Sequence, residues 1–574
     1  MYQPGYRSAR RRLAHWRWFE HLRALLHVVA ALALLGTLLV SSFAEAYFSR
    51  GVASGVTYEP LPFTNGNPMG VNTFLNEEPD PAVVERSLQM IAEGGFGYVR
   101  QIFGWYEIEP QPDTFIDANG VSTWEKYDRI VDLAVANGLQ LIVRLEKPPR
   151  WARAGAANPE IDGPPDRLQD YVDFVEMVVA RYAGRVTYFQ IWNEPNLAGE
   201  WGGEAIDPRG YVDLLQAGYG AVKRANPDAV VLLAGLAPTE ELGPDNLSDL
   251  LFLERVYEAG GADYFDIATV MVYGYGYSPF DRRVSFARNN FSRPIQTREI
   301  MVRHGDAGTP IWAVEYGWVS LPEGWTGRPS PWGASVSPDT QARYLVEGFA
   351  RAQQEWPWMG VMAVWAFRFV RPPDDPAERD NPTRGFAIVE HDFTPRPAYT
   401  ALARVAPTLQ RDFPGSYQLS AEQQTWLARG EPLDIFLYGE RLDVLVFGDG
   451  ALHVSVDGGA PATKRIATDA WRLLTVAEGL DNGPHVVRLR LGAVEGRQLP
   501  AIDGYVVSRN PLHTWVYPWV NAALFLALLL VLASALWTLV DLRGIRALRA
   551  RPAFPARHAY PQPAMYHSRR EGRT

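Results

Sequence analysis

The hydrophobic pattern divides the chain into two long apolar runs near its ends and a central part of short apolar segments. Residues 24–44 form the first run, broken only by His27 and a few small polar residues, and residues 520–540 form the second. About 20 apolar residues suffice for a helix to cross a bilayer. The pattern therefore predicts transmembrane helices at 22–45 and 515–541.

Basic residues flank both runs on the side away from the centre of the chain. Residues 1–21 hold five Arg and one Glu, and residues 542–574 hold eight Arg and one Glu. Arg and Lys accumulate on the cytoplasmic side of membrane helices. We therefore expect two cytoplasmic basic tails, a location in the cell membrane, and an extracytoplasmic central part between the two spans.

The first apolar run has a second interpretation. Ala44-Glu45-Ala46 fits the small-residue pattern of a signal-peptide cleavage site. The run is long for a signal peptide, so we favour an uncleaved anchor, followed by a linker at 46–64.

Short apolar segments alternate with amphipathic ones between residues 65 and 412. The amphipathic segments, such as Leu168–Tyr182, have the spacing of helices that bury one face. Eight alternations with strands of the buried type predict an α/β fold, a closed parallel (β/α)8 TIM barrel. The eight strands are expected at Met69–Asn72, Tyr98–Phe103, Leu139–Leu145, Tyr188–Ile191, Ala229–Ala234, Ile267–Tyr273, Pro310–Glu315 and Val361–Phe367.

The pattern changes at residues 413–510, where short strands with alternating polarity follow one another. Asp449-Gly450 and Asp457-Gly458 are typical of hairpin turns. We predict a small antiparallel β-sandwich here. It either binds carbohydrate or spaces the barrel from the membrane, and we favour the spacer because no aromatic platform is evident in the sequence.

Composition excludes several classes of function. The net charge is −10 although the two tails are basic, so the body of the chain is acidic and nucleic acid is not an expected partner. The chain has no Cys, which excludes disulfides and thiolate sites. No spacing typical of metal ligands or of nucleotide binding is present, so we expect neither a metal nor a cofactor.

Two glutamates follow apolar strands of the predicted barrel. Glu194 comes directly after the strand Tyr188–Ile191, which Pro195 ends because proline has no backbone N–H for a ladder. Glu315 ends the apolar run that starts at Pro310. Barrel enzymes carry their chemistry at the carboxyl ends of strands, and two carboxyls are the equipment for double displacement at a sugar.

The motif Trp192-Asn193-Glu194-Pro195 with a late strand-end Glu315 resembles the clan of retaining (β/α)8-barrel glycoside hydrolases. Cellulase-like, β-xylosidase-like and exopolysaccharide-cleaving enzymes belong to this clan, and the resemblance covers about residues 65–410. It implies that Glu194 is the acid/base, that Glu315 is the nucleophile, and that Asn193 binds the sugar 2-hydroxyl.

The resemblance also suggests supporting residues. Arg100 is expected to hold the nucleophile anionic, and either Tyr273 or Tyr275 to donate a hydrogen bond to it. Trp365 is expected to form the floor under the sugar. Further candidates for contacts with the sugar are Glu146, Trp151 and Trp318.

These observations predict a membrane-anchored retaining glycoside hydrolase acting on a β-linked polysaccharide or oligosaccharide. Two alternatives stay open: a transglycosylase that uses the same residues, and a non-catalytic glycan-binding or assembly protein on a barrel scaffold.

Overall fold

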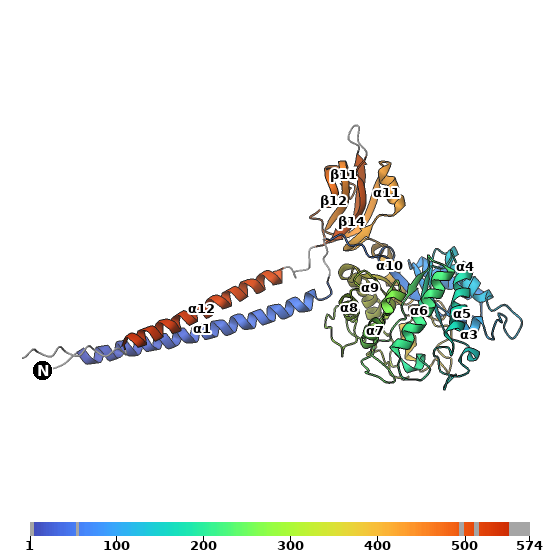
Figure 1. Cartoon of the computed structure of the whole chain (residues 1–574), viewed down its shortest axis with the longest axis horizontal. Coiled ribbons are helices and arrows are strands. Elements are labelled where there is room, and N and C mark those ends of the chain that lie inside the picture. Colours follow the sequence, from blue (N-terminus) through green and yellow to red (C-terminus); the bar gives the residue numbers. More distant parts are fainter. Residues whose placement is uncertain (1–4, 53–56, 493–498, 510–515, 550–574) are drawn as a thin grey trace, which may run out of the picture. The chain divides into compact units, whose positions relative to one another are not determined.

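The computed structural model describes residues 5–52, 57–492, 499–509 and 516–549. The chain forms two compact units: the two end segments together make one, and Tyr47–Leu512 makes the other (Figure 1). Of the predicted basic tails, residues 1–4 and 550–574 lie outside the described residues, as do residues 53–56 of the predicted linker, residues 493–498 and 510 of the predicted β-sandwich and residue 515 of the second predicted span.

A parallel eight-stranded sheet forms the centre of the larger unit. The strands neighbour one another in the order β5-β4-β3-β2-β1-β8-β7-β6, and Leu232 of β5 pairs in parallel with Ile267 just before β6. This pairing closes the sheet, so the predicted barrel is confirmed. The strands are β1 (Met69–Asn72), β2 (Tyr98–Gly104), β3 (Gln140–Glu146), β4 (Tyr188–Ile191), β5 (Val230–Leu232), β6 (Ala268–Tyr273), β7 (Ile311–Gly317) and β8 (Met359–Val364).

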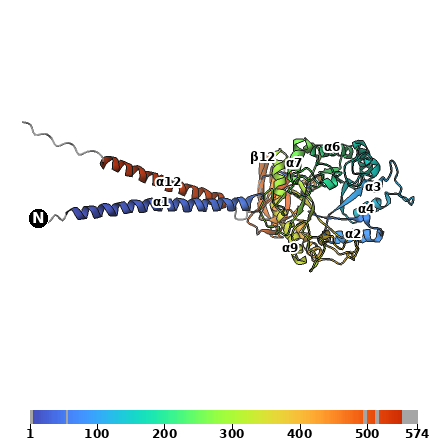
Figure 2. The same ribbon diagram turned by 90° about the horizontal axis from the view of Figure 1, so that it is seen from below.

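Helices follow the strands and surround them (Figure 2). Their first turns are stabilised by local chemistry: Asp80, Asp207 and Ser337 each cap a helix whose first residue is proline. Each helix buries one face against the strands. The barrel helices are α2 (Pro81–Glu93), α4 (Glu125–Ala136), α5 (Leu168–Arg181), α6 (Pro208–Ala225), α7 (Asp249–Glu258), α8 (Pro294–Arg303), α9 (Pro338–Glu355) and α10 (Pro397–Leu409), and the short α3 (Trp105–Ile108) follows β2.

A β-bulge in β7 interrupts the alternation of its side chains. Val270 of β6 pairs with Ala313, but the next residue of β6, Met271, pairs with Glu315, so Val314 is an extra residue. Val314 belongs to the apolar cluster inside the barrel, whereas Tyr316 packs in the outer cluster against the helices. The extra residue turns Glu315 to the inside, as bulges near active sites commonly do.

The region after the barrel is an antiparallel β domain, as predicted. Its strands β9 (Gly415–Gln418), β10 (Leu433–Gly439), β11 (Arg441–Val456), β12 (Ala462–Ala477), β13 (Gly483–Gly492) and β14 (Ala501–Ser508) accompany the helix α11 (Ala421–Ala428). The first half of β11 pairs with β14 and its second half with β13, while β12 follows it on the other side. The domain has its own apolar core.

Two details of the β domain differ from the sequence interpretation. Asp449-Gly450 is no hairpin turn but lies within β11, where Gly448 takes a φ of 105° beside a shift in the pairing register. Trp471 and Phe447 are 49% and 41% exposed with ring centroids 5.5 Å apart. The pairing of β11 with β12 thus brings together two exposed aromatic residues that lie 24 positions apart in the sequence.

The smaller unit consists of α1 (Gly5–Ser49) and α12 (Val516–Arg549). Their apolar stretches, His21–Ser49 and Val516–Val540, are long and apolar enough to cross a membrane. Two polar contacts join the helices: His27 Nε2 lies 3.0 Å from Ser534 Oγ, and Asn521 Nδ2 donates to Glu45 Oε2 at 2.6 Å. The predicted spans fall on these two helices.

Candidate active site

Glu315 is buried inside the barrel, at the carboxyl end of β7, and is held by two donors. Arg100 of β2 donates from Nη1 to its Oε1 at 2.8 Å, and the Tyr273 hydroxyl of β6 donates to its Oε2. Tyr275 does not take part, since its hydroxyl donates to the Pro238 carbonyl instead. Of the two tyrosines named from the sequence, Tyr273 is the one whose hydroxyl contacts Glu315.

Arg100 connects Glu315 to the rest of the site. Its Nε donates to Gln190 Oε1 at 2.9 Å, its Nη1 also donates to Asn72 Oδ1 at 2.9 Å, and its Nη2 donates to Asn193 Oδ1 at 2.7 Å. Its side chain is 1% exposed. A buried guanidinium needs such a set of acceptors, and the acceptors come from β1, β4 and the residues that follow β4.

Glu194 differs from Glu315 in the surroundings of its carboxyl. No hydrogen bond to its carboxyl is found among the described residues, and its backbone nitrogen donates to the Gly235 carbonyl at 2.8 Å. Burial, followed by the negative charge of Glu315, raises the pKa of Glu194 to about 8. The carboxyl therefore holds its proton at neutral pH.

The backbone around Glu194 is unusual. Trp192 and Glu194 have φ angles of 72° and 46°, and Tyr275 after β6 has 50°. Residues other than glycine seldom adopt this left-handed region, and such residues cluster at functional sites. β4 ends at Ile191, just before these residues, and Glu194 lies near enough to Glu315 for the charge of Glu315 to raise its pKa.

Three ion pairs involve residues of β3 and the residue that follows it, and two of their members act on Glu194. Arg144 and Glu146 of β3 approach to 2.9 Å, and Lys147 contacts Glu200 at 2.9 Å and also Asp162. The charge of Glu200 raises the pKa of Glu194, and that of Arg144 lowers it. Glu200 and Arg144 therefore act on the pKa of Glu194 through their charges, and no hydrogen bond joins either of them to its carboxyl among the described residues.

Trp365 follows β8 and is partly exposed. Its ring lies edge-on to Phe74, with centroids 5.4 Å apart, and no partner of its buried indole nitrogen is found among the described residues. The position fits the predicted floor of a sugar site, because an aromatic ring with a free N–H presents an apolar surface and one donor.

Trp318 differs from the expectation that it contacts sugar. Trp318 is 1% exposed, its Nε1 donates to the Tyr277 carbonyl, and Phe291 stacks on it. The indole of Trp318 fits here because residue 274 is glycine, and a Cβ at that position would overlap the ring. Trp318 is thus a core residue. Trp151 is partly buried, packs edge-on against Trp105 and donates to the Glu109 carbonyl.

Sequence reasoning missed three residues of the site, Asn72, Gln190 and Glu200. Asn72 ends β1 and Gln190 interrupts the apolar β4, so a polar residue at the end or inside of a buried strand was the available signal. Glu200 had no such signal, because it lies on a loop and reaches the site only through the fold.

Comparison with known proteins agrees with this geometry. Residues 62–251 match the family model described as cellulase (glycosyl hydrolase family 5), a segment that includes Arg100, Asn193 and Glu194. The resemblance to the (β/α)8 glycoside hydrolase clan is confirmed. No curated protein matches the sequence significantly.

Several solved structures are similar to part of this chain. A family 39 glycoside hydrolase from the gut symbiont Bacteroides cellulosilyticus WH2 is 19% identical over 75% of this chain and 82% of that chain, with a TM-score of 0.46. A glucosidase from Croceicoccus marinus is 14% identical over 76% and 98%, with a TM-score of 0.44. GH5_18 from Streptomyces cattleya, in complex with GlcNAc, is 17% identical over 62% and 83%, with a TM-score of 0.44.

Proposed function

We propose that the protein is a retaining glycoside hydrolase that cleaves β-linked O-glycosidic bonds in a polysaccharide or oligosaccharide. The observation that carries the proposal is the contrast between its two central carboxyls. Arg100 and Tyr273 donate hydrogen bonds that favour the charged form of Glu315, whereas burial raises the pKa of Glu194 and favours its protonated form. A nucleophile and an acid need these two opposite states.

The proposed reaction has two steps. In the first, Glu315 attacks the anomeric carbon, the bond from that carbon to the leaving oxygen breaks, and Glu194 gives its proton to that oxygen. In the second, Glu194 takes a proton from water, the resulting oxygen attacks the same carbon, and Glu315 leaves as a carboxylate. Two inversions retain the configuration of the sugar.

Asn193 and Trp365 are proposed to position the sugar. Because Asn193 accepts from Arg100 through Oδ1, its amide nitrogen is the group that can donate to a sugar hydroxyl. Trp365 offers its ring as the floor and, as a donor, its Nε1, for which the described residues provide no partner. Glu146, paired with Arg144, and Trp151 stay weaker candidates for contacts with hydroxyls.

Covalent labelling tests the mechanism. The full chain in detergent micelles is incubated with a panel of 2-deoxy-2-fluoro β-glycosides bearing good leaving groups, and its peptides are mapped by mass spectrometry. We expect an adduct on Glu315 that is absent in Glu315→Gln and unchanged in Glu85→Gln, an exposed carboxylate of α2. Folded protein that binds glycans but forms no adduct and cleaves nothing would favour a binding protein. Products that depend on an added sugar acceptor would favour a transglycosylase.

We also propose that α1 and α12 anchor the barrel outside the cell membrane. The support is the length and apolarity of both helices and the Arg excess of both tails, which favours cytoplasmic ends. A tether at both ends would keep the enzyme beside a surface polysaccharide.

The absence of cysteine makes this topology simple to test. Single cysteines are introduced at Asp469 in the β domain and at Ala559 in the C-terminal tail, and intact cells are treated with a membrane-impermeant maleimide. The proposal expects labelling at position 469 only, and labelling at position 559 only after lysis. Labelling of position 559 in intact cells would overturn it.

A further inference from the structure

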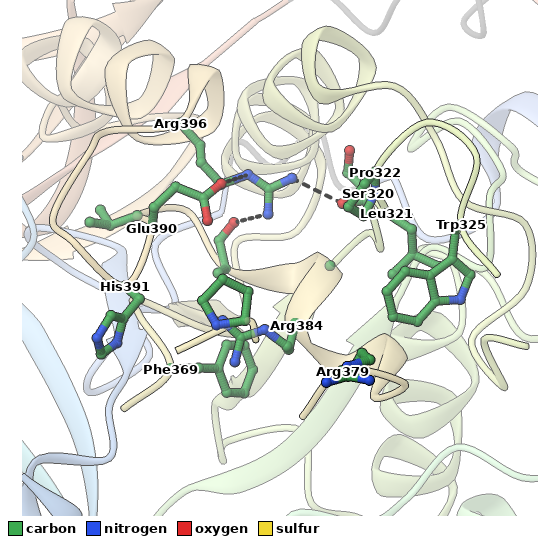
Figure 3. Close-up of a pocket in the computed structure, with 14 residues that line it drawn as sticks. Ser320, Leu321, Pro322, Trp325, Phe369, Arg379, Arg384, Glu390, His391 and Arg396 are labelled. Carbon is green, nitrogen blue, oxygen red and sulfur yellow. Dashed lines mark hydrogen bonds and ion pairs between the residues drawn. The ribbon is translucent and has the colours of Figure 1, made fainter. Parts of the chain in front are cut away.

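A cavity of about 120 Å³ lies between the loops that follow β7 and β8 (Figure 3). Arg396 and Glu390 form one side of it and Trp325 the other, with Arg384, Arg379 and Phe369 between them. None of these residues has a role in the double-displacement mechanism.

Aromatic contacts join this cavity to the floor of the active site. The ring of Phe369 stacks on Phe74 with centroids 5.3 Å apart, and Phe74 in turn contacts Trp365 at 5.4 Å. On the other side, Gly385 lines the cavity, and the ring of its neighbour Phe386 lies 5.3 Å from that of Tyr273. A glycan that reaches across Trp365 would therefore meet this cavity.

Trp325 is held firmly enough to serve as a wall. A Cβ on Gly327 would lie 2.3 Å from its ring, so the indole rests directly on that glycine. Its Nε1 donates to the Arg328 carbonyl at 3.0 Å, and Arg328 binds the Asp380 carbonyl of the other loop through its backbone and side chain. Aromatic walls of this kind pack against the apolar faces of sugars.

The lining carries more positive than negative charge. Three arginines face one carboxylate, Glu390, which lies 3.5 Å from Arg396. Arg396 is occupied, because it also donates to the carbonyls of Ala387 and Ser320.

The guanidinium of Arg384 uses only one of its nitrogens for hydrogen bonds to the described residues. It uses Nη1 for the Arg371 carbonyl at 2.8 Å, and that nitrogen lies 3.9 Å from Glu378. Among the described residues, no hydrogen-bond partner is found for its Nε and Nη2. Two such donors on one guanidinium match the two oxygens of a carboxylate. Arg379, exposed and without an ion pair to a described residue, adds a second positive charge.

We propose that this cavity is a subsite for a sugar unit that carries a carboxylate, so that the natural substrate is an acidic glycan. Arg384 binds the carboxylate, Arg379 supports it through its charge, and Trp325 and Phe369 contact the ring of the sugar. The inference rests on the proposed function, because it assigns the substrate class of the same enzyme.

Matched oligosaccharides test the subsite by binding, separately from catalysis. Two pairs of β-1,4-linked tetrasaccharides are used, glucose against glucuronate and mannose against mannuronate. Their dissociation constants are measured by calorimetry on the full-length Glu315→Gln chain in detergent. We expect at least one acidic member to bind more tightly than its neutral partner, on the order of tenfold at low salt, where charge attraction is strongest.

Arginine variants decide whether the cavity is responsible. Arg384→Gln and, independently, Arg379→Gln should each weaken binding of the acidic member, the former on the order of tenfold, with little effect on the neutral one. Arg384→Lys should recover only part of the loss, because lysine lacks the fork. Arg343→Gln, an exposed arginine of α9, is the matched control and should change nothing.

The outcomes separate this inference from the proposed function. Three results would overturn the subsite. Both neutral oligosaccharides bind as tightly as their acidic partners or more tightly, neither acidic oligosaccharide binds, or both arginine variants leave the binding of the acidic oligosaccharide unchanged. Arginine-dependent acidic binding in a wild-type chain that hydrolyses none of the four oligosaccharides would uphold the subsite and count against hydrolysis. Hydrolysis of neutral and acidic oligosaccharides at equal kcat/KM would uphold the hydrolase and count against the acidic subsite.

Discussion

The pKa of Glu194 leads to a prediction about the pH dependence of the enzyme. The pKa rises from its ordinary 4.5 to about 8, and each tenfold change in acid dissociation corresponds to about 1.4 kcal/mol. Ionising Glu194 in the folded site therefore costs on the order of 5 kcal/mol more than in water. Because the first step needs the protonated acid, kcat/KM should fall as the pH rises through about 8.

Variants of neighbouring charges sharpen this prediction. Glu200→Gln removes a negative charge that raises the pKa of Glu194, so the alkaline limb should move to lower pH. Arg144→Gln removes a positive charge that lowers it, so the limb should move to higher pH. The assay is kcat/KM from about pH 5 to about pH 10 with an aryl glycoside whose leaving group needs protonation.

Glu194→Gln provides the control. It should lose the alkaline limb and most activity on such a substrate, but much less on one with an activated leaving group, which departs without a proton. An alkaline limb that persists in Glu194→Gln, or that neither charge variant moves, would refute the assignment of Glu194 as the acid.

The same pKa has a consequence for stability. Since the folded state binds the proton more tightly than the unfolded state, the favourable contribution is complete below pH 4.5 and is lost as the pH rises to about 8. Glu194→Gln removes this dependence. Relative to wild type, the thermal midpoint of the variant should therefore rise between these pH values, and a constant difference would contradict the burial argument.

Three further substitutions follow from the contacts. Tyr273→Phe removes the hydroxyl that donates to Glu315. A hydrogen bond to a charged group contributes about 1.5–3 kcal/mol, so kcat/KM should fall at least about tenfold. An unchanged kcat/KM would contradict the proposed role of Tyr273. Arg100→Met leaves the buried Glu315 without its cation, which should cost about 3–5 kcal/mol of stability and abolish activity; a fully stable, active variant would speak against the pair. Trp318→Ala should cost about 3–5 kcal/mol through the cavity it creates and leave KM unchanged, whereas a raised KM without loss of thermal stability would indicate contact with substrate.

Periodicity made most of the barrel predictable. The segment Leu168–Tyr182 was expected as a helix and α5 occupies Leu168–Arg181; the strand expected at Met69–Asn72 is β1. Buried parallel strands are almost wholly apolar, and their helices repeat every 3.6 residues. Both patterns are local, so they can be recognised in the sequence without knowledge of the tertiary structure.

The β domain was less predictable because its signals conflict. Asp449-Gly450 has the composition of a hairpin turn. Both residues nevertheless pair with β12, so β11 continues through them without a turn. β12 itself, in which only three of 16 residues are buried, lacks the apolar alternation by which strands are found. Neighbouring strands, rather than local propensity, decide such segments.

The sequence by itself determined the barrel, the two apolar end helices and the pair of glutamates, because each follows from local periodicity or from a short motif. Only the tertiary structure decided how those residues act. Closure of the barrel brings Arg100, Tyr273 and Glu315 together from β2, β6 and β7, and the bulge at Val314 turns Glu315 inward. Packing likewise separates two tryptophans that both follow strands, burying Trp318 and leaving Trp365 partly exposed. Contacts between distant residues depend on register and packing, which no short stretch of sequence encodes.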